Sequence, residues 1–467
     1  MKLAMYTPMP PTRTGVAHYS SMLVPALRER IEIEVIESNN RQPTTDNRLY
    51  QLGNNPHHEF AYRAAMQHPG VIVLHDIVLH HLIVEMTLAR GDVDGYVAAL
   101  AASHGEAGAA WARGRAAGLH SEMGNFLLPA SIDVANRSRA VIVHNRYAAD
   151  RLRSFGVRTP IHVVPHPYQP ALASSRRDEI RAKHGFAATD RIIGLFGFLT
   201  SAKRSDVVLE AFTKARADMP SLRLLVVGEA APNIDTVAFG AEGITFTGFV
   251  PDEEFPAYFA AVDRLVNLRY PTAGETSGTL IRAFDAGKPV AVSDYAQFAE
   301  LPDDCVVKIP FGDAEFISLA DFFFRDISDP SSAQRRWLEE NADIEKTVQG
   351  YLAAIDVAQA LLPARADKSV CATLPLFPKL EVVERTGTSL TVRNIGEATL
   401  RAREYGQPGY HLIANGRWLD LPRDLAPGDQ AILELPSDLR DMRLELMDGM
   451  QGIPLVEPEA WGRVAIH

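Results

Sequence analysis

Short, unbroken runs of apolar residues recur along the chain up to about residue 310, and each is followed by a stretch with helical spacing. Lys2–Tyr6, Val71–Leu74 and Ala140–Val143 are runs of this kind, and the pattern begins again at Arg191–Phe198 and Arg223–Gly228. Strands without apolar–polar alternation are buried on both faces, which is typical of parallel sheets covered by helices on each side. The sequence therefore predicts two successive doubly wound α/β domains.

The pattern changes near the C-terminus. Ala333–Leu361 has helical spacing throughout and predicts one continuous helix. Beyond it, short runs such as Lys379–Val383, Ser389–Arg393 and Gln430–Leu435 are separated by turns, including Pro427-Gly428-Asp429. Many short strands between turns favour a small all-β sandwich. The expected domains are 1–165 (Rossmann-like), 166–363 (Rossmann-like, ending in a helix that crosses back) and 372–467 (β-sandwich).

Charge and cysteine content argue against several classes of protein. The chain has 47 basic and 58 acidic residues without a basic stripe interleaved with aromatics, so we expect no nucleic-acid partner. Two cysteines cannot form a disulfide framework, which favours a reducing compartment. The most apolar long segment, Val71–Ala89, contains histidine and acidic residues, and Met1–Pro8 lacks the apolar core of a signal peptide. These features predict a cytoplasmic protein.

A glycine loop with two cations stands at the start of the second α/β pattern. Gly194–Asp206 contains a strand end, a glycine turn and then Lys203 and Arg204 at the beginning of a helix. Backbone N–H groups at a helix start bind anions, and a neighbouring lysine adds a point charge for phosphate. A single loop of this type also occurs for purely structural reasons, so its weight depends on the next motif.

The second motif is the polar segment Arg269–Gly278, which precedes another helix. Its Thr276, Ser277 and Gly278 would present N–H donors at the helix N-terminus. Glu275 could bind sugar hydroxyls there, or it could only complement the helix dipole. A polar loop after a strand of an open α/β sheet lies at the usual ligand-binding edge, which favours the binding role.

Together these motifs make residues 1 to about 360 resemble the large retaining glycosyltransferase family of GT-B architecture (glycosyltransferase family 4-like), which includes many bacterial mannosyl- and glucosyltransferases. The resemblance implies two Rossmann-like domains facing across a cleft, with a nucleotide sugar held mainly by the second. It implies that Lys203 contacts the donor diphosphate and that Glu275 contacts the donor sugar.

The chain departs from the family pattern at several positions. The family arginine five residues before the lysine is Phe198 here, and Arg204 is expected to take its place. The family's second glutamate, which usually holds the nucleotide ribose, falls on Arg282. Glu300 stands where family members carry a glutamate turn, without the usual glycines, and is expected to bind the donor.

The first domain offers two further positions. Gly15 resembles the family glycine whose backbone approaches the donor phosphates, and His75, at the end of a strand, resembles the histidine placed against the donor sugar. Asp76 is expected to cap the following helix. His57-His58 and His104-Gly-Glu106 lack metal-ligand partners at convincing spacing, so no metal or other cofactor is expected.

The resemblance implies transfer of a hexose, with retained anomeric configuration, from a nucleotide-diphosphate sugar to a glycan or lipid-linked acceptor hydroxyl. It places the reaction in bacterial surface polysaccharide synthesis, with peripheral membrane association through the acceptor at the inner face of the membrane. Two alternatives remain open. One is a nucleotide-sugar epimerase of the same architecture, and the other is a catalytically silent carbohydrate-binding or scaffold subunit, which the missing second glutamate favours.

Overall fold

The computed structural model describes residues 1–38, 42–119, 123–170, 176–231, 234, 240–360, 380–385, 389–394, 410–414, 417–423, 425–426, 428–434, 444–448, 451–453 and 455–456. The chain divides into two compact units that are interleaved in sequence. The first unit comprises Met1, Pro8–Ile33 and Val163–Ala353. The second comprises Lys2–Thr7, Glu34–His162 and the described residues from Ala354 onward.

The first unit contains a six-stranded sheet with the order β12-β11-β10-β7-β8-β9, in which all neighbouring strands are parallel. This is the doubly wound arrangement predicted for the second α/β pattern. The strands are β7 (Arg191–Phe196), β8 (Leu222–Val227), β9 (Ile244–Phe246), β10 (Arg264–Asn267), β11 (Val290–Ser293) and β12 (Val307–Ile309).

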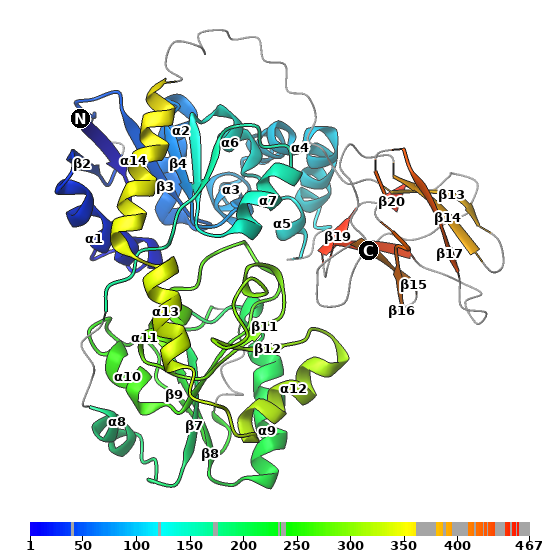
Figure 1. The fold of residues 1–467 in the computed structure, drawn as a ribbon. Coiled ribbons are helices and arrows are strands. Elements are labelled where there is room, and N and C mark those ends of the chain that lie inside the picture. Colours follow the sequence, from blue (N-terminus) through cyan, green and yellow to red (C-terminus); the bar gives the residue numbers. More distant parts are fainter. Residues whose placement is uncertain are drawn as a thin grey trace. The chain divides into compact units, whose positions relative to one another are not determined.

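Helices cover both faces of this sheet (Figure 1). Because successive strand residues point to opposite faces, Ile192 and Ile193 of β7 belong to two different hydrophobic clusters. The cluster around Ile192 includes residues of α8 (Arg177–Lys183), α10 (Phe255–Ala261), α11 (Gly278–Asp285) and α13 (Ser331–Asn341), and the one around Ile193 includes residues of α9 (Ser205–Asp218) and α12 (Asp313–Phe324). The unbroken apolar runs of the sequence are explained by this burial on both sides.

The predicted continuous helix over Ala333–Leu361 is wrong, because the chain forms α13 and a separate α14 (Ile344–Ala360). Ala342 leaves helical geometry at φ −137°, and its carbonyl accepts a hydrogen bond from the N–H of Tyr168. Asp343 then starts α14, since its carboxylate accepts from the N–H of Lys346 at 2.9 Å. Apolar spacing continues through the break, which hid the new start.

The segment Pro8–Ile33 belongs to the first unit, together with the sheet formed by β7–β12. Its helix α1 (Gly15–Arg28) begins where the Thr14 hydroxyl accepts from the N–H of Ala17. The Tyr19 and Tyr351 hydroxyls are hydrogen-bonded at 2.6 Å, and Arg30 pairs with Glu345 at 2.8 Å. These contacts join α1 and the residues just after it to α14.

The second unit is built on a six-stranded sheet with the order β2-β1-β3-β4-β5-β6, and β1–β3, β3–β4 and β4–β5 are parallel pairs. Its β3 was not predicted, because Arg48 and Gln51 interrupt its apolar run, although most of the strand is buried. The strands are β1 (Lys2–Tyr6), β2 (Glu32–Ile36), β3 (Arg48–Leu52), β4 (Val71–Leu74), β5 (Ala140–Val143) and β6 (Ile161–Val163). The helices are α2 (Glu59–Gln67), α3 (His80–Met86), α4 (Val93–Ala116), α5 (Gly124–Leu127), α6 (Ile132–Arg137) and α7 (Arg146–Ser154).

The C-terminal strands form two four-stranded sheets with the orders β17-β14-β13-β20 and β16-β15-β18-β19. Buried and less buried residues alternate in β14 and β17, as expected for a sheet with one covered face. The strands are β13 (Leu380–Arg385), β14 (Ser389–Asn394), β15 (Tyr410–Ala414), β16 (Arg417–Asp420), β17 (Gln430–Glu434), β18 (Leu444–Asp448), β19 (Gln451–Ile453) and β20 (Leu455–Val456). The sandwich packing of these strands stays a prediction.

No helix among the described residues combines the length and the apolar character that spanning a membrane requires.

Candidate functional site

Three glycines lie at the carboxyl ends of the neighbouring strands β7, β8 and β9. The N–H of Gly197 donates to the carbonyl of Val227 at 2.8 Å, and the N–H of Gly228 donates to the carbonyl of Gly248 at 3.0 Å. Gly197 has φ +86°, and a Cβ atom there would lie 2.8 Å from Nζ of Lys203. The absence of a side chain therefore lets the turn after β7 close onto the lysine.

Lys203 is buried at this turn, immediately before α9. The residue is 7% exposed, and Nζ donates to the carbonyl of Phe196 at 2.6 Å. Burial lowers the pKa of Lys203 well below 10.5, and the positive charge of Arg269 lowers it further, while Glu275 acts in the opposite direction. The ammonium group is therefore poorly stabilised in the protein alone, and a nearby anion would stabilise it.

Arg204, the second cation of the same turn, pairs with Glu315 on α12, whose side chain is buried. The guanidinium also lies over the rings of Phe311 and Tyr270, with centroid distances of 5.0 and 5.9 Å. Its charge is thus already balanced by a carboxylate. The predicted contact of Arg204 with the donor stays a prediction.

The carboxylate of Glu275 is held by three donors from its own loop. Oε1 accepts from Nε of Arg269 at 2.9 Å, and Oε2 accepts from the hydroxyl of Thr272 and the N–H of Ala273 at 3.1 and 3.0 Å. The amide of Gln297 donates to the carbonyl of Glu275 and fixes the loop from the other side. About a quarter of the Glu275 side chain is exposed (24%), so the carboxylate is both held in place and accessible.

Ser277 is the N-cap of α11, because its hydroxyl oxygen accepts from the N–H of Leu280 at 3.3 Å. The same hydroxyl donates to Oδ1 of Asn267 at 3.1 Å. Among the described residues, Nδ2 of Asn267 is a buried donor without an acceptor. Thr276 is half-buried and Gly278 is exposed. The helix start therefore adds a spare amide donor to its own N–H groups.

Glu300 and Gly15 are each found at an exposed position. Glu300 follows the 3-10 turn Ala296–Phe298. Gly15 begins α1, and a Cβ atom there would meet nothing within 4 Å, so its backbone is open to an approaching group. The predicted donor contacts of both residues remain predictions.

His18, Asp252 and Arg282 form a polar cluster that sequence reasoning did not identify. Nδ1 of His18 lies 3.8 Å from Oδ2 of Asp252, whose Oδ1 lies 3.4 Å from Nη1 of Arg282. Burial lowers the pKa of His18, and Arg282 lowers it further. Nearby, the guanidinium of Arg13 lies 4.1 Å from the ring centroid of Phe249. Arg282, which replaces the family's ribose-binding glutamate, is therefore joined to a carboxylate from another loop.

In the second unit, His75 follows β4 and contacts residues from the neighbouring strands. Its Nε2 lies 2.6 Å from Oε1 of Gln51 on β3, and its ring centroid lies 5.1 Å from that of His144, which follows β5. Because the amide oxygen is an acceptor, this hydrogen bond assigns a proton to Nε2. The sequence suggested that Asp76 caps the following helix. Its carboxylate instead accepts from the N–H of Asn54, and α3 has no side-chain cap.

The other buried histidines of this unit serve the fold. His80 bridges the carbonyl of Leu128 and the hydroxyl of Tyr96, at 2.6 Å each. Burial lowers the pKa of His58 to about 4 and that of His104 to about 3, so both are neutral near pH 7. Within the part of the chain that the structure describes, no group of three or more His, Cys, Asp or Glu residues is arranged to hold a metal ion.

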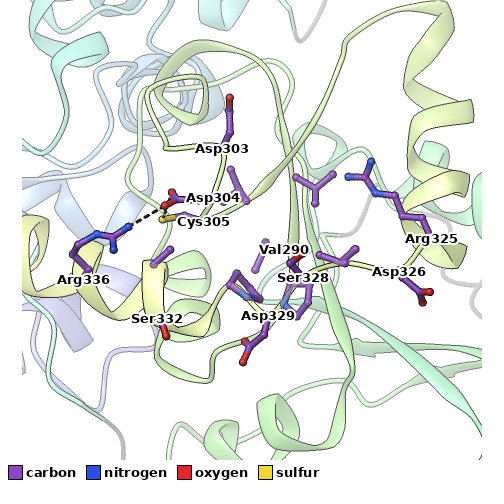
Figure 2. Close-up of a pocket in the computed structure, with 16 residues that line it drawn as sticks. Val290, Asp303, Asp304, Cys305, Arg325, Asp326, Ser328, Asp329, Ser332 and Arg336 are labelled. Atoms are coloured by element: carbon purple, nitrogen blue, oxygen red, sulfur yellow. Dashed lines mark hydrogen bonds and ion pairs between the residues drawn. The ribbon is translucent and has the colours of Figure 1, made fainter.

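A cavity of about 630 Å³ lies at the amino ends of β11 and β12, away from the carboxyl ends of β7–β9 where the glycines lie (Figure 2). Its walls come from the starts of these strands and from the stretch that joins α12 to α13. Arg336 pairs with Asp304 at 2.9 Å, and burial raises the pKa of the Cys305 thiol to about 12. None of the site residues predicted from the sequence lines this cavity.

Comparison with known proteins agrees with the motifs found around the β7–β12 sheet. Residues 190–320 match the family model described as "Glycosyl transferases group 1". A curated relative, the 2-deoxystreptamine glucosyltransferase of Streptomyces kanamyceticus, is 26% identical over 245 residues. That alignment covers 49% of this chain and 58% of the relative's length.

The fold is similar to that of solved structures with bound UDP or UDP-glucose. Anabaena HepE in complex with UDP and glucose matches 76% of this chain and 99% of its own, with a TM-score of 0.55 and 14% identity. Its complex with UDP-glucose matches 78% and 99%, with a TM-score of 0.50 and 14% identity. Residues 190–320 are thus similar to glycosyl transferases group 1, and the fold is of the GT-B type with two Rossmann-like sheets.

Proposed function

We propose that this chain is a retaining glycosyltransferase that moves a hexose from a nucleoside-diphosphate sugar to an acceptor hydroxyl. The observation that carries the proposal is the charge arrangement between β7 and α11. Lys203 and Arg269 are both buried there, and the carboxylate of Glu275 is bonded to Arg269 and also acts on the pKa of Lys203. Two buried cations beside one carboxylate leave positive charge that a diphosphate would neutralise in a site partly screened from water.

In the proposed reaction, the bond between the anomeric carbon and the diphosphate oxygen breaks, and negative charge accumulates on the leaving diphosphate. Lys203 and the N-terminus of α11 stabilise that charge by position, before the bond breaks. Arg204 remains a proposed donor contact. Its pairing with Glu315 makes Arg269 the better candidate for the second cation.

Because Lys203 and Arg269 supply the positive charge in this scheme, we expect turnover to be unchanged in excess EDTA.

The acceptor hydroxyl attacks the face from which the diphosphate leaves, and the leaving phosphate oxygen takes the hydroxyl proton, which gives retention. Glu275 and His75 are the proposed sugar-orienting residues. The Gln51 amide already holds the ring of His75 in one orientation. Gly15, Thr276, Ser277, Gly278 and Glu300 remain proposed donor contacts. A side-chain general base is not needed in this scheme.

The donor and acceptor are proposed from chemistry and similarity. UDP-glucose is the first donor to test, because HepE was crystallised with it and the curated relative is a glucosyltransferase. A glycan or lipid-linked hydroxyl in bacterial surface polysaccharide synthesis is the proposed acceptor. Contact with the inner face of the membrane would then be through that acceptor.

The proposal is tested by calorimetric titration with UDP, GDP and ADP, followed by incubation with UDP-glucose and an acceptor pool. We expect one nucleotide to bind and a glycosylated acceptor to form. An altered sugar with intact diphosphate and no acceptor product would indicate an epimerase. Absence of both nucleotide binding and donor hydrolysis would indicate a silent subunit, which the pairing of Arg282 with Asp252 would then help to explain.

We predict that UDP binding takes up protons in alkaline buffer. The pKa of Lys203 is lowered well below 10.5 by burial and by Arg269, and a bound diphosphate should raise it again. Between these two pKa values binding must bring a proton, up to about one per site, and in alkaline buffer UDP itself is fully ionised. Calorimetry in buffers of different ionisation enthalpy measures this uptake. A binding enthalpy independent of the buffer would contradict the prediction.

We also predict that a chain ending at residue 362 keeps nucleotide binding and donor hydrolysis. All the residues proposed to hold the donor precede α14, and the C-terminal strands contribute none of them. Activity on a long acceptor should fall, while activity on a short one is retained. If a folded, monodisperse shortened protein loses nucleotide binding, the C-terminal strands take part in the donor site.

A further inference from the structure

Arg269 is held as firmly as the carboxylate that it contacts. It follows β10, its side chain is 11% exposed, and its own N–H donates to the hydroxyl of Ser293 at 2.9 Å. Nε donates to Oε1 of Glu275 and Nη1 donates to the carbonyl of Leu268, both at 2.9 Å. Contacts at both Nε and Nη1 leave the guanidinium little freedom to turn.

The two oxygens of Glu275 are not equivalent. Oε2 receives two hydrogen bonds, from the Thr272 hydroxyl and the Ala273 N–H, and these use both of its lone pairs. Oε1 receives only the bond from Arg269, so one acceptor position remains on that oxygen. A further donor, such as a hydroxyl group, can therefore be accepted only beside Arg269.

We propose that Arg269 is a positioning residue, which fixes Oε1 of Glu275 as the carboxylate oxygen that faces the donor sugar. The inference deepens the proposed function and rests on it. Arg269 orients the carboxylate through Nε, while its charge, close to Lys203, adds to the positive field that the diphosphate enters. One guanidinium thereby acts on both the sugar end and the phosphate end of the donor.

The test uses the full chain and the variants Arg269→Gln and Arg269→Lys, with UDP and UDP-glucose as probes. Arg269→Gln should lower kcat at least about 30-fold, since Oε1 loses its fixed direction. The UDP dissociation constant should rise as well, because the diphosphate loses one of its two buried cations. Arg269→Lys keeps the charge without the planar donor, so its kcat should fall between those of wild type and Arg269→Gln. Arg325→Gln, at the opposite edge of the sheet and exposed, is the matched control and should equal wild type.

Proton uptake gives a readout that a purely structural role would not change. Without the charge of Arg269, Lys203 should be more fully protonated before binding, so Arg269→Gln should take up fewer protons with UDP than wild type. Wild-type kcat in folded Arg269→Gln, or proton uptake equal to wild type, would overturn the assignment. If Arg269→Gln does not fold, an Arg269→Lys variant with wild-type kcat overturns it equally. Wild-type protein that neither binds UDP nor turns over UDP-glucose would overturn the proposed function, and this inference with it.

Discussion

Replacing Lys203 with methionine should lower kcat/KM for the donor at least about 30-fold, or about 2 kcal/mol of transition-state stabilisation. The ammonium lies against the glycine turn after β7, and its proposed counter-charge in the reaction is the leaving diphosphate. Methionine fills the same space without charge, so the loss reports the missing electrostatic interaction rather than a cavity. Steady-state kinetics with UDP-glucose measures the effect.

The same variant should be as stable as wild type or more stable. Because the folded-state pKa of Lys203 is lowered, the unfolded chain binds its proton more tightly than the folded one. The wild-type free energy of unfolding therefore rises as the pH rises through the interval between the lowered pKa and 10.5. In Lys203→Met this rise with pH should be absent. Thermal unfolding at several pH values measures it.

Lys288→Met is the matched control for this experiment. Lys288 is also largely buried, donates to a backbone carbonyl, that of Ala260 at 3.3 Å, and has a pKa lowered mainly by burial. It lies before β11, at the sheet edge opposite Lys203. Turnover equal to wild type is expected for the control. Equal losses in both variants would assign the Lys203 effect to general packing.

Replacing Glu275 with glutamine should lower kcat about 100-fold while UDP affinity stays within about threefold of wild type. The amide has one oxygen instead of two, so it cannot accept from Arg269 on one side and from Thr272 and Ala273 on the other. The sugar-facing acceptor is lost or turned, while the N-terminus of α11 and Lys203 remain. Parallel measurement of kcat, KM and the UDP dissociation constant separates these effects.

Glu34→Gln is the control for Glu275→Gln. Glu34 is also mostly buried and accepts from the N–H and the hydroxyl of Thr44, but it belongs to β2 and to none of the proposed donor contacts. Unchanged kcat in Glu275→Gln would leave this residue with only a structural role in its loop. Collapse of UDP affinity would instead assign it to the phosphate end of the donor.

The buried strands were predictable from the sequence because their physical signal is local. β4, β7 and β8 are unbroken apolar runs, and their predicted bounds agree closely with the observed ones. β3 was missed because Arg48 and Gln51 lie in its run, and whether such polar groups are buried depends on partners far along the chain. The Gln51 amide that orients His75 was missed for the same reason.

The candidate site could be predicted in position but not in its internal connections. The glycine turn and the loop before α11 are visible as sequence motifs, and both lie at the carboxyl edge of one sheet. That Arg269 holds Glu275, while Arg204 turns to Glu315, depends on side-chain geometry that residue spacing does not encode. The same holds for the meeting of His18, Asp252 and Arg282, which lie far apart in sequence.

Pro8–Ile33 belongs to the same compact unit as Val163–Ala353, and this constrains how the protein can be recombined with relatives. A chimaera joined at a single point near residue 163 would separate Tyr19 from Tyr351 and Arg30 from Glu345. An exchange with two crossovers, which transfers residues 8–33 together with 163–353, would keep both pairs. Specificity exchange between such enzymes therefore has a natural module that is discontinuous in the gene.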